Sequence, residues 1–324
     1  MRKILVLRGG ALGDFIVTLP ALALLRQHWP AAHIELAGNA TAADLGVRAG
    51  LIDRAHSQHE ARWSALYASG PLPTAFAEYL ATFDLVLNFW PDPSETLAAH
   101  FAHLSTPIFR SSSALPIRAP AAAHYCEPLR PLGLPAKTSF HLLAPPSPKP
   151  HLIALHPGSG SPQKNWPLSR WIALCRWLHA DHHAELLIIT GEADGPAATA
   201  LAPFGTSAHQ LPLAQLVARL TECSRFLGHD SGISHLAAAC GVPSVLLFGP
   251  TDPAMWAPPA PHVTVIRRGP SLAEISLADV QTALRPLPAV RKESATAFRS
   301  QRPRIVAPDA RPQQSDSSPA ILSL

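Results

Sequence analysis

Residues 225–256 decide the fold that we predict for this chain: Arg-Phe-Leu-Gly-His-Asp-Ser-Gly-Ile-Ser-His-Leu-Ala-Ala-Ala-Cys-Gly-Val-Pro-Ser-Val-Leu-Leu-Phe-Gly-Pro-Thr-Asp-Pro-Ala-Met-Trp. A short apolar run gives way to a polar turn at 228–232, and residues 233–240 then show apolar positions at helical spacing. The apolar run 242–248 is short enough for a buried parallel strand. The pattern predicts strand, polar loop, short helix, strand and second polar loop.

The polar turn also predicts an anion site. Asp230 or Ser231 can cap the helix, whose free N–H groups and dipole then face the carboxyl edge of a sheet, where a phosphate is stabilised. A well-capped helix without any ligand is the structural alternative. His229 and His235 flank the cap and another polar loop follows at 249–251, which favours a ligand site.

Composition narrows the class of protein. The 324 residues are enough for about two domains, 47% are apolar and 15% are charged, and the formal charge is +4. This mild excess suits an anionic small ligand or an acidic membrane surface, and no basic stripe indicates nucleic acid. No apolar run approaches the ~18 residues of a membrane span. The four scattered cysteines predict reduced, buried thiols of a cytosolic protein.

The chain order predicts an α/β protein with two domains. A strand at 4–7, a glycine-rich turn and a helix from Phe15 open the first domain, 1–142, in which a further helical stretch is expected around 60–81. Four prolines between residues 145 and 150 predict a stiff linker over 143–150. The strand and helix alternation restarts in a second domain, 151–285, and the tail 286–324 has the composition of a disordered segment.

A dinucleotide-binding fingerprint is not met. The glycines stand at 9, 10 and 13 rather than in the Gly-x-Gly-x-x-Gly spacing, and the second strand ends in Gly38-Asn39 without an acid. Glu35 falls inside that strand. These departures argue against a nicotinamide enzyme.

Polar residues of the second domain follow several strands that share one edge. Ser159, Ser161 and backbone N–H groups can hold phosphate oxygens, and Lys164 can neutralise them. An acid in the loop 191–195, either Glu192 or Asp194, can accept from ribose hydroxyls. Each residue has a structural alternative, but together they favour a pocket for a nucleoside diphosphate.

Three segments resemble glycosyltransferase family nine, the ADP-heptose:lipopolysaccharide heptosyltransferases. They are His-Pro-Gly-Ser-Gly-Ser-Pro-Gln-Lys-Asn-Trp-Pro at 156–167, the run from His229 to Thr251, and the opening residues 4–14 with 18–22. The resemblance covers residues 1 to about 285 and is weaker at the start. There Gly9-Gly10 stands where members of the family often carry residues with hydroxyl side chains.

The resemblance implies the GT-B fold, with two Rossmann-like domains and parallel sheets facing a central cleft. It implies Asp14 as the base that deprotonates the acceptor, and acceptor contacts at Arg8 and Gly13. It places the donor sugar and diphosphate at the following residues: Ser159, Ser161, Lys164, Glu192 or Asp194, Asp230, Ser231, Gly232 and His235. Lys164 would also assist the departing diphosphate. An inverting transfer needs such a base on one side and charge stabilisation on the other.

The expected activity is an inverting transfer of a heptose or related sugar from an ADP-sugar, the co-substrate, to a lipid-linked oligosaccharide of the lipopolysaccharide-core type. The enzyme would be bacterial and cytoplasmic, with peripheral contact at the inner membrane face. No cofactor is expected, and no metal, since the chain has no Asp-x-Asp. The alternatives are a GT-B transferase or epimerase that uses a UDP-sugar, and a catalytically silent nucleotide-sugar-binding protein.

Overall fold

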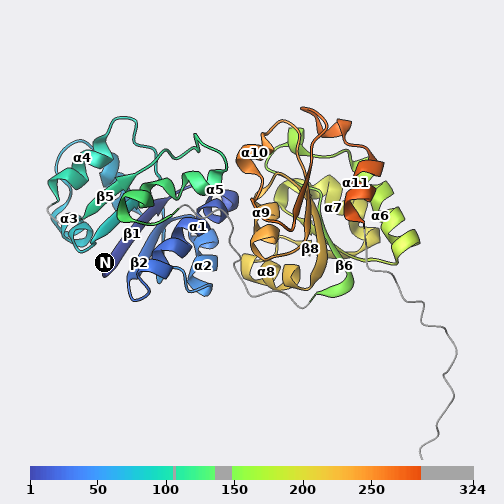
Figure 1. The fold of residues 1–324 in the computed structure, drawn as a ribbon, viewed down its shortest axis with the longest axis horizontal. Helices are drawn as coiled ribbons and strands as arrows, with labels where there is room; N and C mark the ends of the chain where they lie inside the picture. The colour runs from blue at the N-terminus through green and yellow to red at the C-terminus, as the bar shows by residue number, and fades with distance from the viewer. Residues whose placement is uncertain (105–106, 136–147, 286–324) are drawn as a thin grey trace, which may run out of the picture. The chain divides into compact units, whose positions relative to one another are not determined.

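Two parallel β-sheets organise the chain (Figure 1). The computed structural model describes residues 1–104, 107–135 and 148–285. The first sheet has the order β3-β2-β1-β4-β5 and every pairing in it is parallel. Its strands are β1 (Lys3–Arg8), β2 (His33–Gly38), β3 (Arg54–Ser57), β4 (Leu85–Asn88) and β5 (Ile108–Ser111).

The helices that accompany this sheet bury their apolar residues against it. Ile4 and Val6 of β1 point to one face, and Leu5 and Leu7 to the other, and all four are fully buried. The helices are α1 (Leu12–His28), α2 (Ala40–Arg48), α3 (Thr74–Ala81), α4 (Thr96–His103) and α5 (Ala121–His124), with 3₁₀ turns η1 (Ala61–Tyr67) and η2 (Glu127–Leu132).

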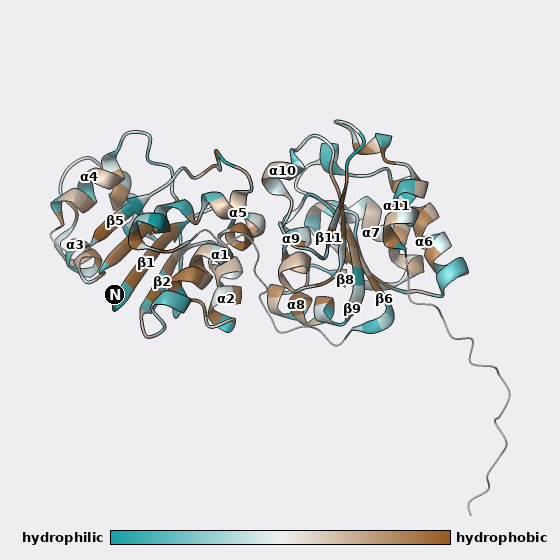
Figure 2. Cartoon of the chain, viewed as in Figure 1, coloured by the Kyte–Doolittle hydropathy of each residue, from teal (hydrophilic) through white to brown (hydrophobic). Residues whose placement is uncertain are grey.

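The second sheet has six parallel strands in the order β11-β10-β9-β6-β7-β8. They are β6 (Lys149–His156), β7 (Glu185–Thr190), β8 (Thr206–His209), β9 (Cys223–His229), β10 (Ser244–Leu247) and β11 (Val263–Ile266). The helices are α6 (Leu168–His182), α7 (Gly195–Leu201), α8 (Leu213–Thr221), α9 (Gly232–Ala239), α10 (Pro253–Trp256) and α11 (Leu277–Leu284). In Figure 2 the strands are coloured mostly as hydrophobic, whereas the helices show mixed colours.

Both strand orders are those of doubly wound sheets, so the predicted α/β fold with two Rossmann-like sheets is confirmed. The described residues belong to one compact unit. Within it, α1 and α9 are in contact, and one hydrophobic cluster runs from β1 through these helices to β9. A side chain on Gly232 of α9 would meet the backbone nitrogen of Gly13 at 2.9 Å, so glycine is required there for the close approach of the two helices.

Several local predictions need correction. The helix expected over 60–81 is the 3₁₀ turn η1 followed by α3, because Gly70, Pro71 and Pro73 interrupt it. Lys149 and Pro150 of the predicted linker already belong to β6. Residues 143–147 of that linker and the tail 286–324 lie outside the described residues, and the domain limits stay predictions. The short elements β3, α2, α5, α7, β8 and α10 are additional to the prediction.

All four cysteines are buried and none forms a disulfide. Among the described residues, we find no helix that combines the length and the apolar character needed to cross a bilayer.

Candidate functional site

The second sheet reverses its strand order between β6 and β9, and the predicted donor loops begin there. His156 at the end of β6 pairs in register with Gly228 of β9, so the segments 157–167 and 230–232 leave the sheet side by side. Ligands of open α/β sheets bind in the crevice at such a switch point. The topology thus brings together two of the loops that the sequence singled out.

Two buried histidines fix the backbone of these loops. His229 is fully buried, its Nε2 accepts from the Trp166 amide at 2.9 Å, and its Nδ1 donates to the carbonyl of Gly158 at 3.2 Å. His156 donates from Nδ1 to the carbonyl of Ile189 at 2.9 Å. Burial lowers the pKa of His229 to about 3, helped by the positive charge that His156 would carry, and burial likewise lowers the pKa of His156. Both rings are therefore neutral and stabilise the loops through hydrogen bonds to the backbone.

Lys164 and Asp230 form the charged centre of this edge. Lys164 Nζ lies 2.8 Å from Asp230 Oδ2, and the hydroxyl of Thr251 donates to the same oxygen at 2.8 Å. The Asp230 side chain is 10% exposed and that of Lys164 is 30% exposed. An ammonium has three N–H donors, and the hydrogen bond to Asp230 uses one of them. Lys164 can therefore still donate to an anion.

The two loop serines differ in their engagement. The hydroxyl of Ser159 lies 2.7 Å from the carbonyl of Ser161 and 2.7 Å from Asn165 Oδ1, so it braces the loop itself. The Ser161 side chain is partly exposed and makes no hydrogen bond within the described residues. Ser161 is thus the freer donor of the pair.

Helix α9 begins at the predicted position. Its N-cap is Ser231, whose hydroxyl accepts from the amide of Ser234, so the cap falls on Ser231 rather than Asp230. Gly232 is the first helical residue. His235 lies one turn later and is buried, and its ring makes no hydrogen bond in the part of the chain that the structure describes. Burial lowers the pKa of His235, although the Asp230 and Asp14 carboxylates act to raise it. Asp14 and Asp230 are therefore close to the same ring.

The acids after β7 are distinguished by the structure. Asp194 is buried, its Oδ2 accepts from the amide of Gly191 at 2.7 Å, and a side chain on Gly158 would overlap its carboxylate. Asp194 thus closes the turn and packs on the loop after β6. Glu192 is exposed and has no hydrogen-bond partner within the described residues.

Asp14 lies in the first turn of α1, at the carboxyl edge of the first sheet. Its Oδ2 accepts from the amide of Ala11 at 2.9 Å and its Oδ1 lies 3.1 Å from Arg8 Nη2. One third of its side chain remains exposed. Arg8 is buried, and its guanidinium also contacts Thr18 and the ring of Tyr125. Arg8 therefore orients Asp14 and has little surface for a ligand, while Gly13 faces Gly232 and His235.

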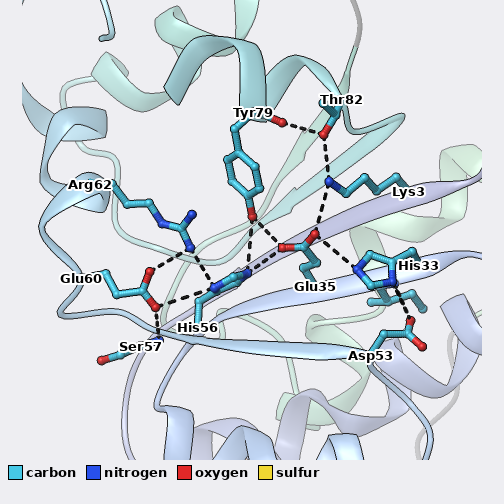
Figure 3. A network of polar contacts seen from close by, with 11 residues as sticks. Lys3, His33, Glu35, Asp53, His56, Ser57, Glu60, Arg62, Tyr79 and Thr82 are labelled. Atoms are coloured by element: carbon cyan, nitrogen blue, oxygen red, sulfur yellow. Dashed lines mark hydrogen bonds and ion pairs between the residues drawn. The ribbon is translucent and has the colours of Figure 1, made fainter. Parts of the chain in front are cut away.

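A separate polar network is buried in the first sheet (Figure 3). Glu35 of β2 accepts from His56 Nε2 at 2.6 Å and from the Tyr79 hydroxyl at 2.7 Å, and pairs with Lys3 at 3.3 Å. Burial alone would raise the pKa of Glu35, but these three partners lower it to about 2. Arg62 donates to His56 Nδ1 at 2.8 Å, which leaves His56 neutral with its proton on Nε2. Glu35 thus serves the interior, in line with its place inside the strand.

The structure thus brings Lys164, Asp230, Ser231, Gly232 and His235 together and sets Ser161 and Glu192 on neighbouring loops. Sequence reasoning missed the aromatic and amide residues at the edge of the first sheet, Gln58, Tyr67 and Trp90, because they come from separate loops with no shared motif. No group of three or more acidic, histidine or cysteine side chains that could hold a metal occurs among the described residues.

Known proteins resemble this chain in sequence family and in fold. The family model described as glycosyltransferase family 9 (heptosyltransferase) matches residues 101–280. A family 9 glycosyl transferase structure from Veillonella parvula aligns with a TM-score of 0.72 at 21% identity, over 88% of this chain and 97% of its own. Escherichia coli heptosyltransferase WaaC with ADP gives 0.68 at 19%, covering 86% and 98%.

The E. coli ADP-heptose lipopolysaccharide heptosyltransferase II gives a TM-score of 0.65 at 20% identity, covering 88% of this chain and 98% of its own. At these identities the structural likeness establishes the fold, which is GT-B. No curated protein matches the chain.

Proposed function

Because this chain belongs to glycosyltransferase family 9, we propose that it moves a heptose or related sugar from an ADP-sugar to an oligosaccharide of the lipopolysaccharide-core type. The transfer inverts the anomeric carbon and uses no metal. The carrying observation is the switch point of the second sheet, where Lys164, Asp230 and the start of α9 lie together. A diphosphate is the ligand that such an edge suits.

The donor side supplies charge stabilisation for the leaving group. As the bond from the anomeric carbon to the diphosphate breaks, the bonding pair stays on the phosphate oxygen. The free N–H groups of Lys164 and the backbone amides at the start of α9, from Gly232, donate hydrogen bonds that stabilise the resulting negative charge. Asp230 keeps the ammonium in place at 2.8 Å. Ser161 provides a further hydroxyl donor from the loop after β6.

Glu192 is the acid that we assign to the ribose hydroxyls. Asp194 is occupied with the amide of Gly191 and is buried against Gly158. Glu192 is exposed on the same loop. The choice that the sequence left open thus falls on the acid whose carboxylate is free to accept.

Asp14 is the proposed base. Its partly exposed carboxylate takes the proton of the acceptor hydroxyl while the hydroxyl oxygen bonds to the anomeric carbon, and Arg8 holds the carboxylate in orientation. Helices α1 and α9 are in contact, and the carboxylates of Asp14 and Asp230 both interact electrostatically with the ring of His235. The base therefore lies near the leaving-group site. For a lipid-linked acceptor, we place the reaction at the cytoplasmic face of the membrane.

Calorimetry with ADP and UDP tests the donor assignment. We expect ADP to bind more tightly, and incubation with ADP-heptose to release ADP at a rate that depends on added core oligosaccharide. Tighter binding of UDP would instead favour a UDP-sugar enzyme. Binding of ADP-heptose without turnover on any core acceptor would favour a silent binding protein.

A further inference from the structure

A second pocket opens at the carboxyl edge of the first sheet and has no assigned role. Its volume is ≈ 530 Å³, which is within the range of small-ligand pockets, roughly 300–1,000 Å³. The loops after β1, β3 and β4 and the turn η1 form it, and β1 and β4 flank the switch point of this sheet. The residues that matter are Gly9, Gly10, Gln58, Glu60, Tyr67 and Trp90.

Aromatic rings form one wall of this pocket. The rings of Tyr67 and Trp90 are stacked, with centroids 6.5 Å apart and planes 25° apart. Tyr67 is 48% exposed, so part of its ring faces solvent. A flat, partly exposed ring offers its face to the C–H groups of a sugar ring, and the adjacent amide of Gln58 can bond the hydroxyls.

The glycines keep the pocket open and lead to the base. A side chain on Gly9 would come within 2.8 Å of Gln58 Oε1 and 3.4 Å of Trp90 Nε1, so it would fill the space between them. Gly10 has φ +99° and a side chain there would overlap the carboxylate of Asp14. Gly10 therefore lines the pocket and also borders Asp14, which is not itself a lining residue.

The charges around the pocket do not suit an anion. Among the described residues that line it, none is lysine or arginine, and Glu60 is acidic. The neighbouring Arg62 is bound to Glu60 at 2.8 Å and to His56 at 2.8 Å (Figure 3). A carboxylate or phosphate placed here would lose water without gaining a cation.

The polar network of Figure 3 holds the Glu60 side of the pocket in place. Glu60 Oε1 accepts from the amide of Ser57 at 3.0 Å, and Arg62 ties Glu60 to His56, which is itself anchored on Glu35. The negative charge in the pocket is therefore part of a fixed chain of contacts.

We propose that this pocket binds the acceptor through a sugar ring that carries no anionic group, and that it disfavours acceptors whose contacting ring bears a carboxylate or phosphate. This inference rests on the proposed function, because the pocket is the acceptor's only if Asp14 is the base.

Saturation-transfer NMR on the full chain with saturating ADP tests the inference. The probes are the methyl glycosides of glucose, galactose and mannose, with methyl glucuronide and glucose 6-phosphate as the anionic set. At least one neutral glycoside should bind more than about fivefold tighter than either anion, for a like-charge contact near a surface. Equal or tighter binding of the anions, or no binding of any neutral glycoside, would overturn the proposal.

Variants locate the binding in the pocket. Tyr67→Ala should weaken binding of the neutral glycoside about fivefold through the lost ring contact, and Tyr67→Phe should restore it. Val265→Ala removes apolar surface at the exposed edge of the second sheet and should change nothing. Glu60→Gln should reduce the difference in affinity between the neutral glycoside and the anionic sugars. An unchanged affinity in Tyr67→Ala counts against the pocket, whereas a wild-type chain that does not bind ADP counts against the proposed function.

Discussion

The carboxyl edges of the two sheets have the same topology but different chemistry. The edge of the second sheet presents an ion pair, a helix N-terminus and hydroxyls, and its loops are braced by neutral histidines such as His229. The edge of the first sheet presents aromatic rings, glycines and the partly exposed carboxylates of Asp14 and Glu60, and is braced by the ionised Glu35 network. We propose that one edge holds an anion and the other a neutral ring.

In the proposed function, the two edges divide the work of a group transfer. The leaving group carries charge throughout, so its site needs permanent donors. The acceptor is neutral until its proton leaves, so its site needs shape and one base. The predictions below test that division, from the largest expected effect to the smallest.

Asp14→Asn should separate the two edges most clearly. Loss of the base should lower kcat about 10²- to 10⁴-fold, the usual contribution of general base catalysis, while the affinity for ADP stays the same. Stopped assays of ADP release and calorimetry measure the two quantities. Asp44→Asn, on the exposed part of α2, is the matched control. A loss of ADP affinity in Asp14→Asn would contradict the assignment of roles.

Glu35→Gln should weaken the first edge by destabilising the fold. Removing one partner from this buried network should cost about 3 kcal/mol in the free energy of unfolding. Because the pKa of Glu35 is lowered to about 2, its contribution is present at neutral pH and is lost as the pH falls below about 4.5. In thermal melts, the difference in stability between the wild type and Glu35→Gln should thus be smaller at pH 4 than at pH 7. The exposed Glu78→Gln serves as control.

Lys164→Ala tests the charge of the second edge. The variant removes the ammonium and leaves Asp230 to repel a diphosphate, so ADP should bind about 10- to 100-fold more weakly. Calorimetry measures the loss, and the affinity of the neutral glycosides should not change. Lys149→Ala, whose ammonium is exposed and pairs with Glu222, is the control. An unchanged ADP affinity would remove Lys164 from the donor site.

Mild acid should act on the second edge through His229. The folded ring has a pKa of about 3 and the unfolded one about 6.5, so between these values only the unfolded chain binds the proton. The free energy of unfolding should therefore decrease as the pH is lowered through this window, by about 1 kcal/mol at pH 5.5. His229→Gln should make this dependence less steep in thermal melts, the buried His156 and His235 contributing the rest, and His28→Gln, at an exposed site, should not change it. A dependence equally steep in both variants would point to other groups.

The fold and the donor edge were largely predictable because their signals are local. The cap at Ser231 and the helix to Ala239 follow from residue types within one short stretch, and β6, β7 and β9 follow from apolar runs. The short elements β3 and β8 were missed because four residues at partly exposed edges carry no clear alternation. The site residues on separate loops could not be paired from their spacing alone.

By itself, the sequence determined two alternations of strand and helix, the polar loops at the strand ends and the family to which the chain belongs. Only the tertiary structure decided which groups are free. It buries Asp194 against Gly158 and leaves Glu192 exposed, uses Arg8 to hold Asp14, and assembles Gln58, Tyr67 and Trp90 into one pocket. Periodicity and capping act over a few residues along the chain, whereas these partnerships depend on the order of strands in the sheets, which joins segments far apart in sequence.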